Sequence, residues 1–174
     1  EQQRHATGKG FFYTDILNHS WESGVDEGVR FLDIQTGPFA CVDATSHVFI
    51  MYACAARWGR ALAEAASEYE EKADALQMFI RQNLFVEDTG FFHDSWAIDA
   101  PSRRCICFEG LWPVIVGAAT PEQAHRVIRE NLMNPQKLLC EHPVATVALD
   151  DPRFELRMWR GPAWNSMTYW AARG

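Results

Sequence analysis

The stretch Val48-Phe49-Ile50-Met51-Tyr52-Ala53-Cys54-Ala55-Ala56 decides the fold class of this 174-residue chain. A helix with this composition is apolar almost all round, so it must be buried on most of its sides. We expect the helix to begin with Asp43 as its N-cap and to run to about Trp58, with Gly59 as its C-cap. The apolar run is too short to span a bilayer.

The next segment, residues 62–83, predicts a helix of a different kind. One face carries an apolar stripe, and the opposite face is charged, so only one side of this helix packs against a core. The stripe consists of Tyr69, Ala73, Leu76, Ile80 and Leu84, and the charged face of Glu68, Glu70, Glu71, Lys72 and Asp74. An inner helix followed by an outer one is typical of a double-layered helical toroid, and a two-layer helical repeat protein would look similar.

The rest of the chain also favours helices, with minor β content. We expect a third inner helix over residues 105–117 and an outer helix from Pro121 to about Leu132, capped by a Thr120–Gln123 capping box. Residues 134–160 predict a long loop, and a last helix is expected to start at Pro162. The sequence Gly90-Phe91-Phe92 repeats Gly10-Phe11-Phe12, which hints at a recurring structural unit.

Composition excludes several classes of partner. The length fits one domain or part of a larger one, and the net charge is −7, from 16 basic and 23 acidic residues without a basic cluster. Nucleic acid and membrane are therefore not expected partners. The five cysteines are irregularly spaced, and the Cys105-Ile106-Cys107 pair has no matching second pair. We expect reduced thiols in a cytoplasmic protein, with no metal and no cofactor.

Two aromatic segments carry the candidate chemistry. The first is Trp21-Glu22-Ser23-Gly24-Val25-Asp26-Glu27-Gly28-Val29-Arg30-Phe31, in which glycines allow a bent loop that aims Asp26 into a cavity between aromatic walls. Such walls disfavour the charged carboxylate, as a general acid requires. The second is Met158-Trp159-Arg160-Gly161-Pro162-Ala163-Trp164-Asn165, whose tryptophans suit sugar rings and whose Arg and Asn suit hydroxyl groups.

The first segment resembles the E-S-G-x-D-x-x-x-R-[WF] signature of trehalases and glycoside hydrolase family 63. The second resembles the W-R-G-P-x-W signature of family 63 and the mannosylglycerate hydrolase-like glycosidases. Between them, Val42-Asp43 and the segment Gly90–Asp94 also fit. The resemblance covers nearly the whole chain in the right order, and it implies an all-α (α/α)6 toroid, or six-hairpin glycosidase. Residues 1–174 would then be a portion of one catalytic domain, with N-terminal and C-terminal hairpins missing and the remainder of the domain as a partner.

The resemblance implies hydrolysis of an α-glycosidic bond in a small glycoside or oligosaccharide with inversion, and makes Asp26 the general acid. The sugar would be bound by Trp21, Glu22, Arg30, Trp159, Arg160, Trp164 and Asn165. Structural roles remain open for several of these: Glu22 and Arg30 could form an ion pair, Asn165 could mark a helix start, and Asp43 could cap a helix or face the funnel.

The second carboxylate that inversion requires is the main element missing from the sequence. In the families named it is a Glu well beyond the W-R-G-P-x-W segment, so it would lie outside these residues and the chain alone would be inactive. Glu109, flanked by apolar residues, is not assigned this role. Alternatives are a trehalase or glycogen-debranching glucosidase, or a non-catalytic helical module that binds sugar or protein. The first segment departs from the signature at Glu27-Gly28-Val29, which leaves the sugar open.

Overall fold

The computed structural model describes residues 4–6, 10–13, 21–32, 34 and 39–174, and within these residues the chain is mainly helical. The α-helices are α1 (Val42–Ala61), α2 (Ser67–Asn83), α3 (Ser95–Ile98), α4 (Trp112–Ile115), α5 (Pro121–Arg126) and α6 (Asn165–Arg173). Shorter 3₁₀ helices cover Trp21–Ser23, Val29–Phe31, Pro101–Arg103 and Phe108–Leu111, and a π-helix covers Val127–Leu132. The predicted all-α class is confirmed.

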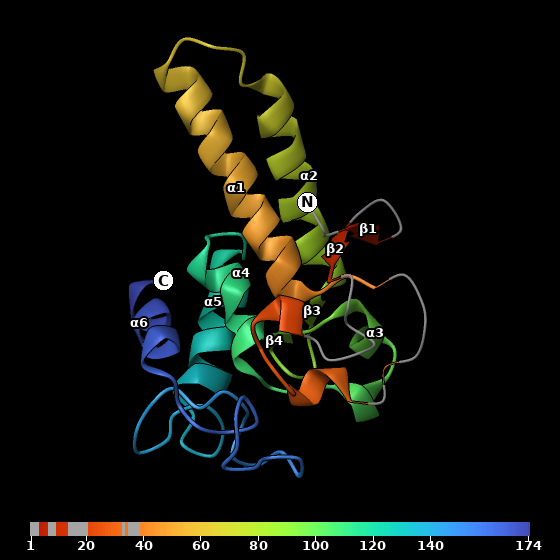
Figure 1. Ribbon diagram of the computed structural model, residues 1–174, viewed down its shortest axis with the longest axis vertical. Coiled ribbons are helices and arrows are strands. Elements are labelled where there is room, and N and C mark those ends of the chain that lie inside the picture. The colour runs from red at the N-terminus through yellow and green to blue at the C-terminus, as the bar shows by residue number, and fades with distance from the viewer. Residues whose placement is uncertain (1–3, 7–9, 14–20, 33, 35–38) are drawn as a thin grey trace.

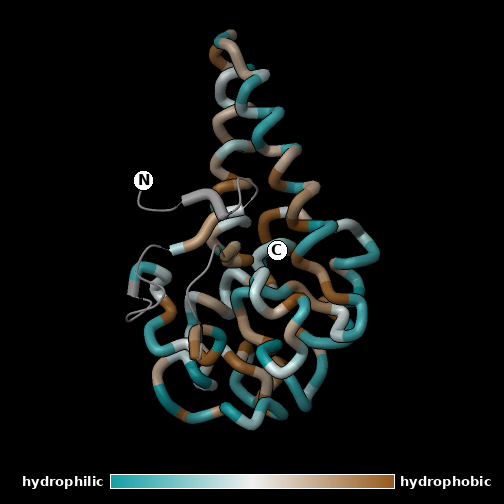
Figure 2. Tube along the Cα trace, turned by 90° about the vertical axis from the view of Figure 1, so that its right-hand side faces the viewer, coloured by the Kyte–Doolittle hydropathy of each residue, from teal (hydrophilic) through white to brown (hydrophobic). Residues whose placement is uncertain are grey.

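Helices α1 and α2 form an antiparallel hairpin that projects from a body made of the remaining elements (Figure 1). The same projection is visible from the side, where the tube of the hairpin stands clear of the body (Figure 2). Burial on α1 is concentrated in its N-terminal part, at Val42, Ala44, Val48 and Phe49, whereas further along Ala56 is buried but Met51 is 66% and Trp58 60% exposed. The expectation that this apolar helix is buried on most sides is therefore wrong within the described residues, because α2 alone packs along its distal half.

The ends of α1 differ from the predicted ends. The N-cap position is Cys41, and Asp43 lies buried in the first turn, where its Oδ1 accepts from the backbone N–H of Ala44 at 2.9 Å. The N–H of Val42 is instead satisfied by Asp94 Oδ1 at 2.8 Å. The helix continues through Gly59 to Ala61, and Ala63, with a φ of 57°, turns the chain toward α2. The carboxylate of Asp94, from a distant segment, thus caps the start of α1 in place of the predicted cap Asp43.

Helix α2 begins at Ser67, five residues later than predicted, and ends at Asn83 as predicted. Its stripe is confirmed at Ala73, Leu76, Ile80 and Leu84, which are all buried. Tyr69 does not belong to it, since this ring is 39% exposed and faces Tyr52 of α1 at a centroid distance of 6.4 Å. Because α2 buries a single apolar stripe, mainly against α1, its other side faces solvent, so α2 lies on the outside.

In the described part of the chain, the paired strands form two short antiparallel hairpins. Strand β1 (Arg4–Ala6) pairs with β2 (Gly10–Phe12), and β3 (Phe85–Val86) pairs with β4 (Phe91–Phe92). The two phenylalanines of each Gly-Phe-Phe sequence lie on the second strand of their hairpin, whereas Gly10 is part of β2 and Gly90 lies in the turn before β4. Phe91 and Phe92 are fully buried and form the centre of the core below the helical hairpin.

The predicted helix over residues 105–117 is broken. Cys107 lies in an extended bridge with Val147, the 3₁₀ helix Phe108–Leu111 follows, and only four residues, α4, are α-helical. A Cβ at Gly110 would lie 2.2 Å from Phe91 Cε1, so this glycine lets the 3₁₀ helix approach β4 closely. Packing against β4 and the strand-like bridge override the helical pattern here.

The C-terminal part follows the prediction more closely. The capping box at the start of α5 is present, with Thr120 and Gln123 bonded reciprocally, and the helical segment runs on through the π-helix to Leu132. Residues 134–160 form a long loop, and α6 begins at Asn165 instead of Pro162. None of the helices among the described residues combines the length and apolar character that a membrane span needs.

Candidate active site

Asp26 lies at a tight turn. The N–H of Gly28 donates to the carbonyl of Val25 at 3.1 Å, which closes a β-turn with Asp26 and Glu27 at its two central positions. Glu27 takes a left-handed conformation, with a φ of 59°. The turn follows the 3₁₀ helix Trp21–Ser23, on which Glu22 is partly buried, whereas the side chain of Trp21 lies outside the described part of the chain.

The second aromatic segment meets the first at this turn. Arg160 Nε donates to the carbonyl oxygen of Glu27 at 2.9 Å, across a sequence separation of 133 residues. Arg157 Nη2 lies 2.7 Å from Glu27 Oε2 and forms an ion pair with it. The long loop thereby brings Arg160 of the second segment, and Arg157 just before that segment, to the residue that follows Asp26.

Trp159, near the end of the long loop, stacks on Trp164, which directly precedes α6. Their ring centroids are 4.6 Å apart with an interplanar angle of 3°, and Trp164 Nε1 donates to the carbonyl of Met158 at 3.2 Å. Trp164 is 38% exposed. Stacking fixes both indoles, and an exposed indole face of this kind suits contact with a sugar ring. Asn165 is the first residue of α6 and is exposed.

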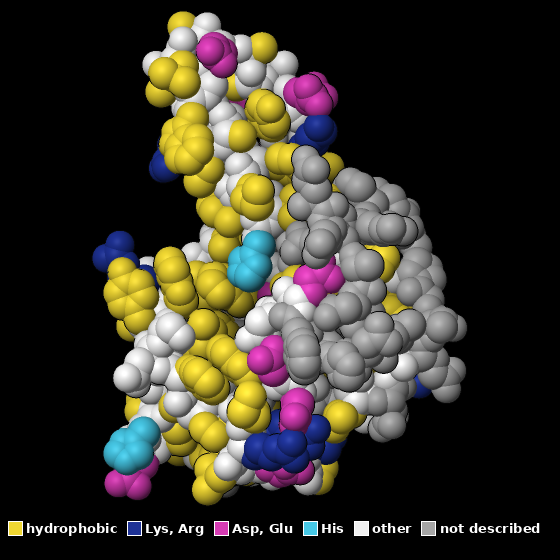
Figure 3. Space-filling model, viewed as in Figure 1, with side chains coloured by type: hydrophobic (Ala, Val, Ile, Leu, Met, Phe, Trp, Pro, Cys, Tyr) yellow, Lys and Arg dark blue, Asp and Glu magenta, His cyan; other side chains and the backbone are white. Residues whose placement is uncertain are grey.

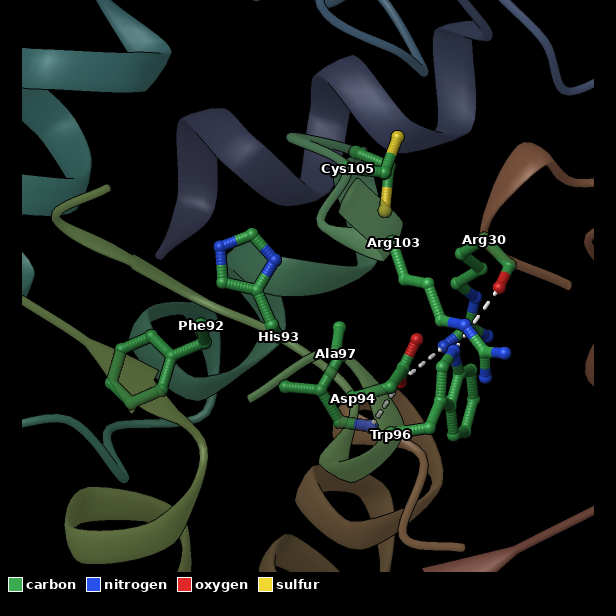
Figure 4. A pocket seen from close by; sticks show the side chains of 10 residues that line it. Arg30, Phe92, His93, Asp94, Trp96, Ala97, Arg103 and Cys105 are labelled. Atoms are coloured by element: carbon green, nitrogen blue, oxygen red, sulfur yellow. Dashed lines mark hydrogen bonds and ion pairs between the residues drawn. The ribbon is translucent and has the colours of Figure 1, made fainter. Parts of the chain in front are cut away.

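Arg30 lies behind the turn in a buried ionic cluster. Its guanidinium donates to both carboxylate oxygens of Asp43, at 3.0 and 2.6 Å, and to Asp94 Oδ1 at 2.8 Å. Glu109 Oε1 lies 2.8 Å from its Nε. Figure 4 shows Arg30 and Asp94 pointing toward one another beside Trp96. Three separate segments, α1, the β4–α3 junction and the 3₁₀ helix Phe108–Leu111, therefore converge on the arginine of the first motif.

The electrostatics of this cluster follow from its burial. Arg30, Asp43, Asp94 and Glu109 are all at most 5% exposed, and one guanidinium faces three carboxyl groups. Burial raises the pKa of Asp94 to about 7, against the opposing effect of Arg30. Burial also raises the pKa of Glu109 above its usual range. A cluster with more carboxylates than guanidinium groups and little contact with water retains a proton near neutral pH, because burying uncompensated charge is costly.

Cys41, Asp43 and Asp94 could offer ligand atoms within 4.8 Å of one another, but their present partners argue against a metal site. Both carboxylates already contact the Arg30 guanidinium, which a cation would have to displace. Burial raises the pKa of the Cys41 thiol well above its ordinary value, which disfavours the thiolate that binds metals. The cluster fits a structural role better.

Within the described part of the chain, one cavity adjoins this cluster and another lies apart from it. One, lined by Arg30, Asp94, Trp96 and Arg103 among others, has a volume of about 10 Å³, which is room for one water at most. The other, of about 180 Å³, lies where α4, the π-helix and α6 meet, and its side chains are apolar, including Leu111, Ile115, Val127 and Leu132. Neither includes Asp26 or Trp159: the first is too small for a sugar, and the second lacks the polar side chains that a sugar requires.

Sequence reasoning did not single out Asp94 as a partner of the first motif, nor the attachment of Glu27 to the long loop. Asp94 ends the segment Gly90–Asp94 that fits the family resemblance, so the sequence marked this residue as notable. It did not indicate that Asp94 pairs with Arg30. The Glu27 contacts had no signal, since nothing in the sequence relates residue 27 to residues 157 and 160.

Comparison with solved structures shows the fold. The GH63 mannosylglycerate hydrolase from Thermus thermophilus, solved in complex with glucose, matches with a TM-score of 0.74 at 18% identity, over 88% of this chain and 47% of that one. Neutral trehalase Nth1 from Saccharomyces cerevisiae matches with a TM-score of 0.69 at 19% identity, over 87% of this chain and 30% of that one. The chain thus spans about half the length of the hydrolase and less of the trehalase.

A search of curated proteins gave no match. A protein-family model, described as the mannosylglycerate hydrolase MGH1-like glycoside hydrolase domain, matches residues 1–174. This match covers every residue, and the fold is shared with the hydrolase and the trehalase described above. The chain therefore belongs to the MGH1-like glycoside hydrolase family.

Proposed function

We propose that this domain serves in the hydrolysis of an α-glycosidic bond with inversion, with Asp26 as the general acid. The observation that carries the proposal is the hydrogen bond from Arg160 Nε to the Glu27 carbonyl, which joins the turn of the proposed acid to the loop of the tryptophan pair. Two segments that each suit one part of glycoside chemistry are then neighbours in space.

In this proposal Asp26 protonates the departing glycosidic oxygen, while a second carboxylate activates water on the opposite face of the sugar. Trp159 and Trp164 supply a flat apolar wall, and Trp21, Glu22, Arg30, Arg160 and Asn165 are the further sugar-binding candidates of the two motifs. Arg30 has the weakest case for direct contact, because its donors face Asp43, Asp94 and Glu109 within the buried cluster.

The general base is proposed to lie outside these 174 residues, as the motif order of the families implies. Glu109 is a poor candidate. It is 4% exposed and its Oε1 faces the Arg30 guanidinium at 2.8 Å, so it lacks access to the water that a base must activate. By this account the chain alone does not turn over substrate.

The substrate is proposed to be a small α-linked glycoside or oligosaccharide. A useful panel contains mannosylglycerate and trehalose, the substrates that the names of the two structural neighbours indicate, together with maltooligosaccharides. Turnover of trehalose or of the maltooligosaccharides would support the trehalase or debranching-glucosidase alternative. Binding without turnover by the full-length protein would support a non-catalytic sugar-binding module.

We also propose that the remainder of the catalytic domain is a partner of these residues, and that the protein works in the cytoplasm. The first proposal is supported by the exposed apolar side chains of α1. The second is supported by the cysteines, since all five are free thiols.

Asp26→Asn in the full-length protein tests the assignment. We expect kcat to fall by about 10³-fold, because amide cannot donate the proton and general acid catalysis contributes roughly 10²–10⁴-fold. Sugar binding, measured by calorimetry, should remain within about threefold, since the amide keeps the shape of the carboxyl group. A matched control is Asp88→Asn, which changes an exposed aspartate outside the motifs.

The stereochemical part is tested by following the first product with NMR. Inversion of an α-linkage gives the β-anomer first, and mutarotation then follows. Appearance of the α-anomer first would contradict inversion, and unchanged turnover in Asp26→Asn would contradict the role of Asp26.

A further inference from the structure

The Asp26 turn is held in an unusual backbone conformation. Glu27, the residue directly after Asp26, has a φ of 59°, in the left-handed region that residues with side chains rarely adopt. The turn has one closing bond of its own, from the Gly28 N–H to the Val25 carbonyl at 3.1 Å. Because a left-handed non-glycine residue costs free energy, contacts from elsewhere must stabilise this conformation.

Arg160 supplies such a contact. Its Nε donates to the Glu27 carbonyl at 2.9 Å, and its Nη1 lies 3.3 Å from Glu155 Oε1, so the guanidinium is held at two points. The side chain is 18% exposed, which protects the charge-assisted bond to the carbonyl from competition by water. Arg160 therefore links the long loop to the Asp26 turn, which lies 133 residues away in the sequence.

The loop that carries Arg160 is itself anchored. The N–H of Glu155 donates to the Arg160 carbonyl at 2.9 Å, and the N–H of Arg160 donates to the Arg157 carbonyl at 2.9 Å. The N–H of Gly161 donates to the buried Thr146 Oγ1 at 3.0 Å. These bonds fix the position of Arg160 relative to the core. Its hydrogen bond to Glu27 therefore restrains the turn against a rigid part of the protein.

The second contact to Glu27 is weaker. The ion pair between Arg157 and the Glu27 carboxylate joins side chains that are 58% and 39% exposed, and ion pairs as open as this contribute little. The two arginines thus make a matched pair: both reach the same residue, Arg160 through a bond to the backbone and Arg157 through an ion pair between more exposed side chains.

We propose that Arg160 is a positioning residue for Asp26: its guanidinium holds the peptide carbonyl that follows Asp26 and so fixes the direction of the acid. This inference rests on the proposed role of Asp26. A catalytic group displaced by about 1 Å can lose on the order of 10²-fold in rate, so a fixed turn is a direct requirement of the chemistry. The W-R-G-P-x-W segment then contributes to the reaction by positioning Asp26 of the first motif, in addition to any contact that it makes with the sugar.

Amide hydrogen exchange of the full-length protein tests the clamp without reference to activity. In Arg160→Ala we expect the Gly28 amide, which closes the turn, to exchange about 10-fold faster or more, because the turn opens more often. In Arg157→Ala, which removes the same charge from the same loop, exchange should rise by less than about twofold, since that ion pair is exposed. Arg129→Ala, at an exposed arginine of the π-helix, is the remote control.

Glu155→Gln provides a second variant in case Arg160→Ala does not fold. It removes the other anchor of Arg160 at a side chain that is 48% exposed, and exchange of Gly28 should rise by about 2–5-fold. Exchange at Gly28 that matches the wild type in Arg160→Ala, or in Glu155→Gln if only that variant folds, would overturn the proposal.

Kinetics separate positioning from sugar binding. A positioning role predicts that Arg160→Ala lowers kcat by about 10–100-fold with KM within about threefold, whereas a sugar contact alone predicts a higher KM with kcat retained. The second pattern would overturn the inference. If Asp26→Asn proved fully active, the proposed function would fail, and hydrogen exchange alone would still decide whether Arg160 holds the turn.

Discussion

Arg30 shows what a single residue can and cannot reveal in the sequence. Its place in the first motif indicated either a sugar contact or an ion pair with Glu22. The structure places its guanidinium against Asp43, Asp94 and Glu109 instead. These residues lie far from Arg30 in the sequence, and no local pattern links them, because the link arises when three segments pack together.

The same cluster predicts how stability depends on pH. The pKa of Asp94 is raised from 3.8 to about 7 by burial, so between these values the native state keeps a proton that the unfolded state releases. The contribution of Asp94 to the free energy of unfolding is therefore present below pH ~4 and is lost as pH rises through ~7. In Asp94→Asn this loss should vanish, since the amide does not ionise and its Oδ1 still accepts from Arg30 and Val42.

The measurement is urea unfolding of wild type and Asp94→Asn at several pH values from about 4 to about 8. The stability of wild type relative to the variant should fall with pH by on the order of a few kcal/mol. Burial of His93 lowers its pKa to about 3 and gives a slope of opposite sign, but this slope is common to both proteins and cancels in the difference. Curves that run parallel over the whole range would contradict the account.

At the scale of elements, hydrophobic periodicity predicted which segments are helical, but it predicted where they begin and end less well. The apolar run and the one-sided stripe gave α1 and α2, and the capping box gave α5, because each signal is local. The helix expected over residues 105–117 was wrong, since its apolar residues serve a bridge to Val147 and the contact of Gly110 with Phe91. Apolar composition alone does not distinguish a buried helix from a buried extended segment.

Ile80 and Met78 test the orientation of α2. Ile80 is fully buried and Met78 is 57% exposed, although both lie on the same helix two residues apart. Ile80→Ala should cost about 2–5 kcal/mol of stability through lost burial and the remaining cavity, whereas Met78→Ala should cost less than about 1 kcal/mol. Chemical unfolding of the two variants measures both values, and equal costs would mean that α2 packs through a different face.

At the scale of the whole molecule, the projecting hairpin exposes apolar side chains that the body of the protein does not cover. Figure 3 shows hydrophobic side chains along the projecting hairpin. Met51 and Trp58 on α1 and Leu62 after it are 66%, 60% and 70% exposed, and their spacing places them on one side of α1. The class of fold was predictable from the sequence, as were the two motifs, but how far the inner helix would be left uncovered was not.

Exposed apolar surface of this kind predicts self-association of residues 1–174 when they are produced alone. Replacing Met51, Trp58 and Leu62 together with Gln should reduce association, measured by light scattering, because these three side chains form the continuous part of the patch. The matched control is Met133→Gln with Leu156→Gln, which removes exposed apolar side chains from loops, at 53% and 83% exposure. Equal improvement in both proteins would show that general hydrophobicity, and not the α1 face, drives association.

Proton donation by Asp26 is the claim on which the functional account depends, and the nature of the leaving group tests it most directly. Fluoride departs from a glycosyl fluoride without a proton from a general acid, whereas an alkoxide leaving group needs one. Asp26→Asn in the full-length protein should therefore lose about 10³-fold in kcat/KM on an alkyl α-glycoside but less than about 10-fold on the matching α-glycosyl fluoride. Equal losses on both substrates, or no loss on either, would contradict the assignment of Asp26 as the acid.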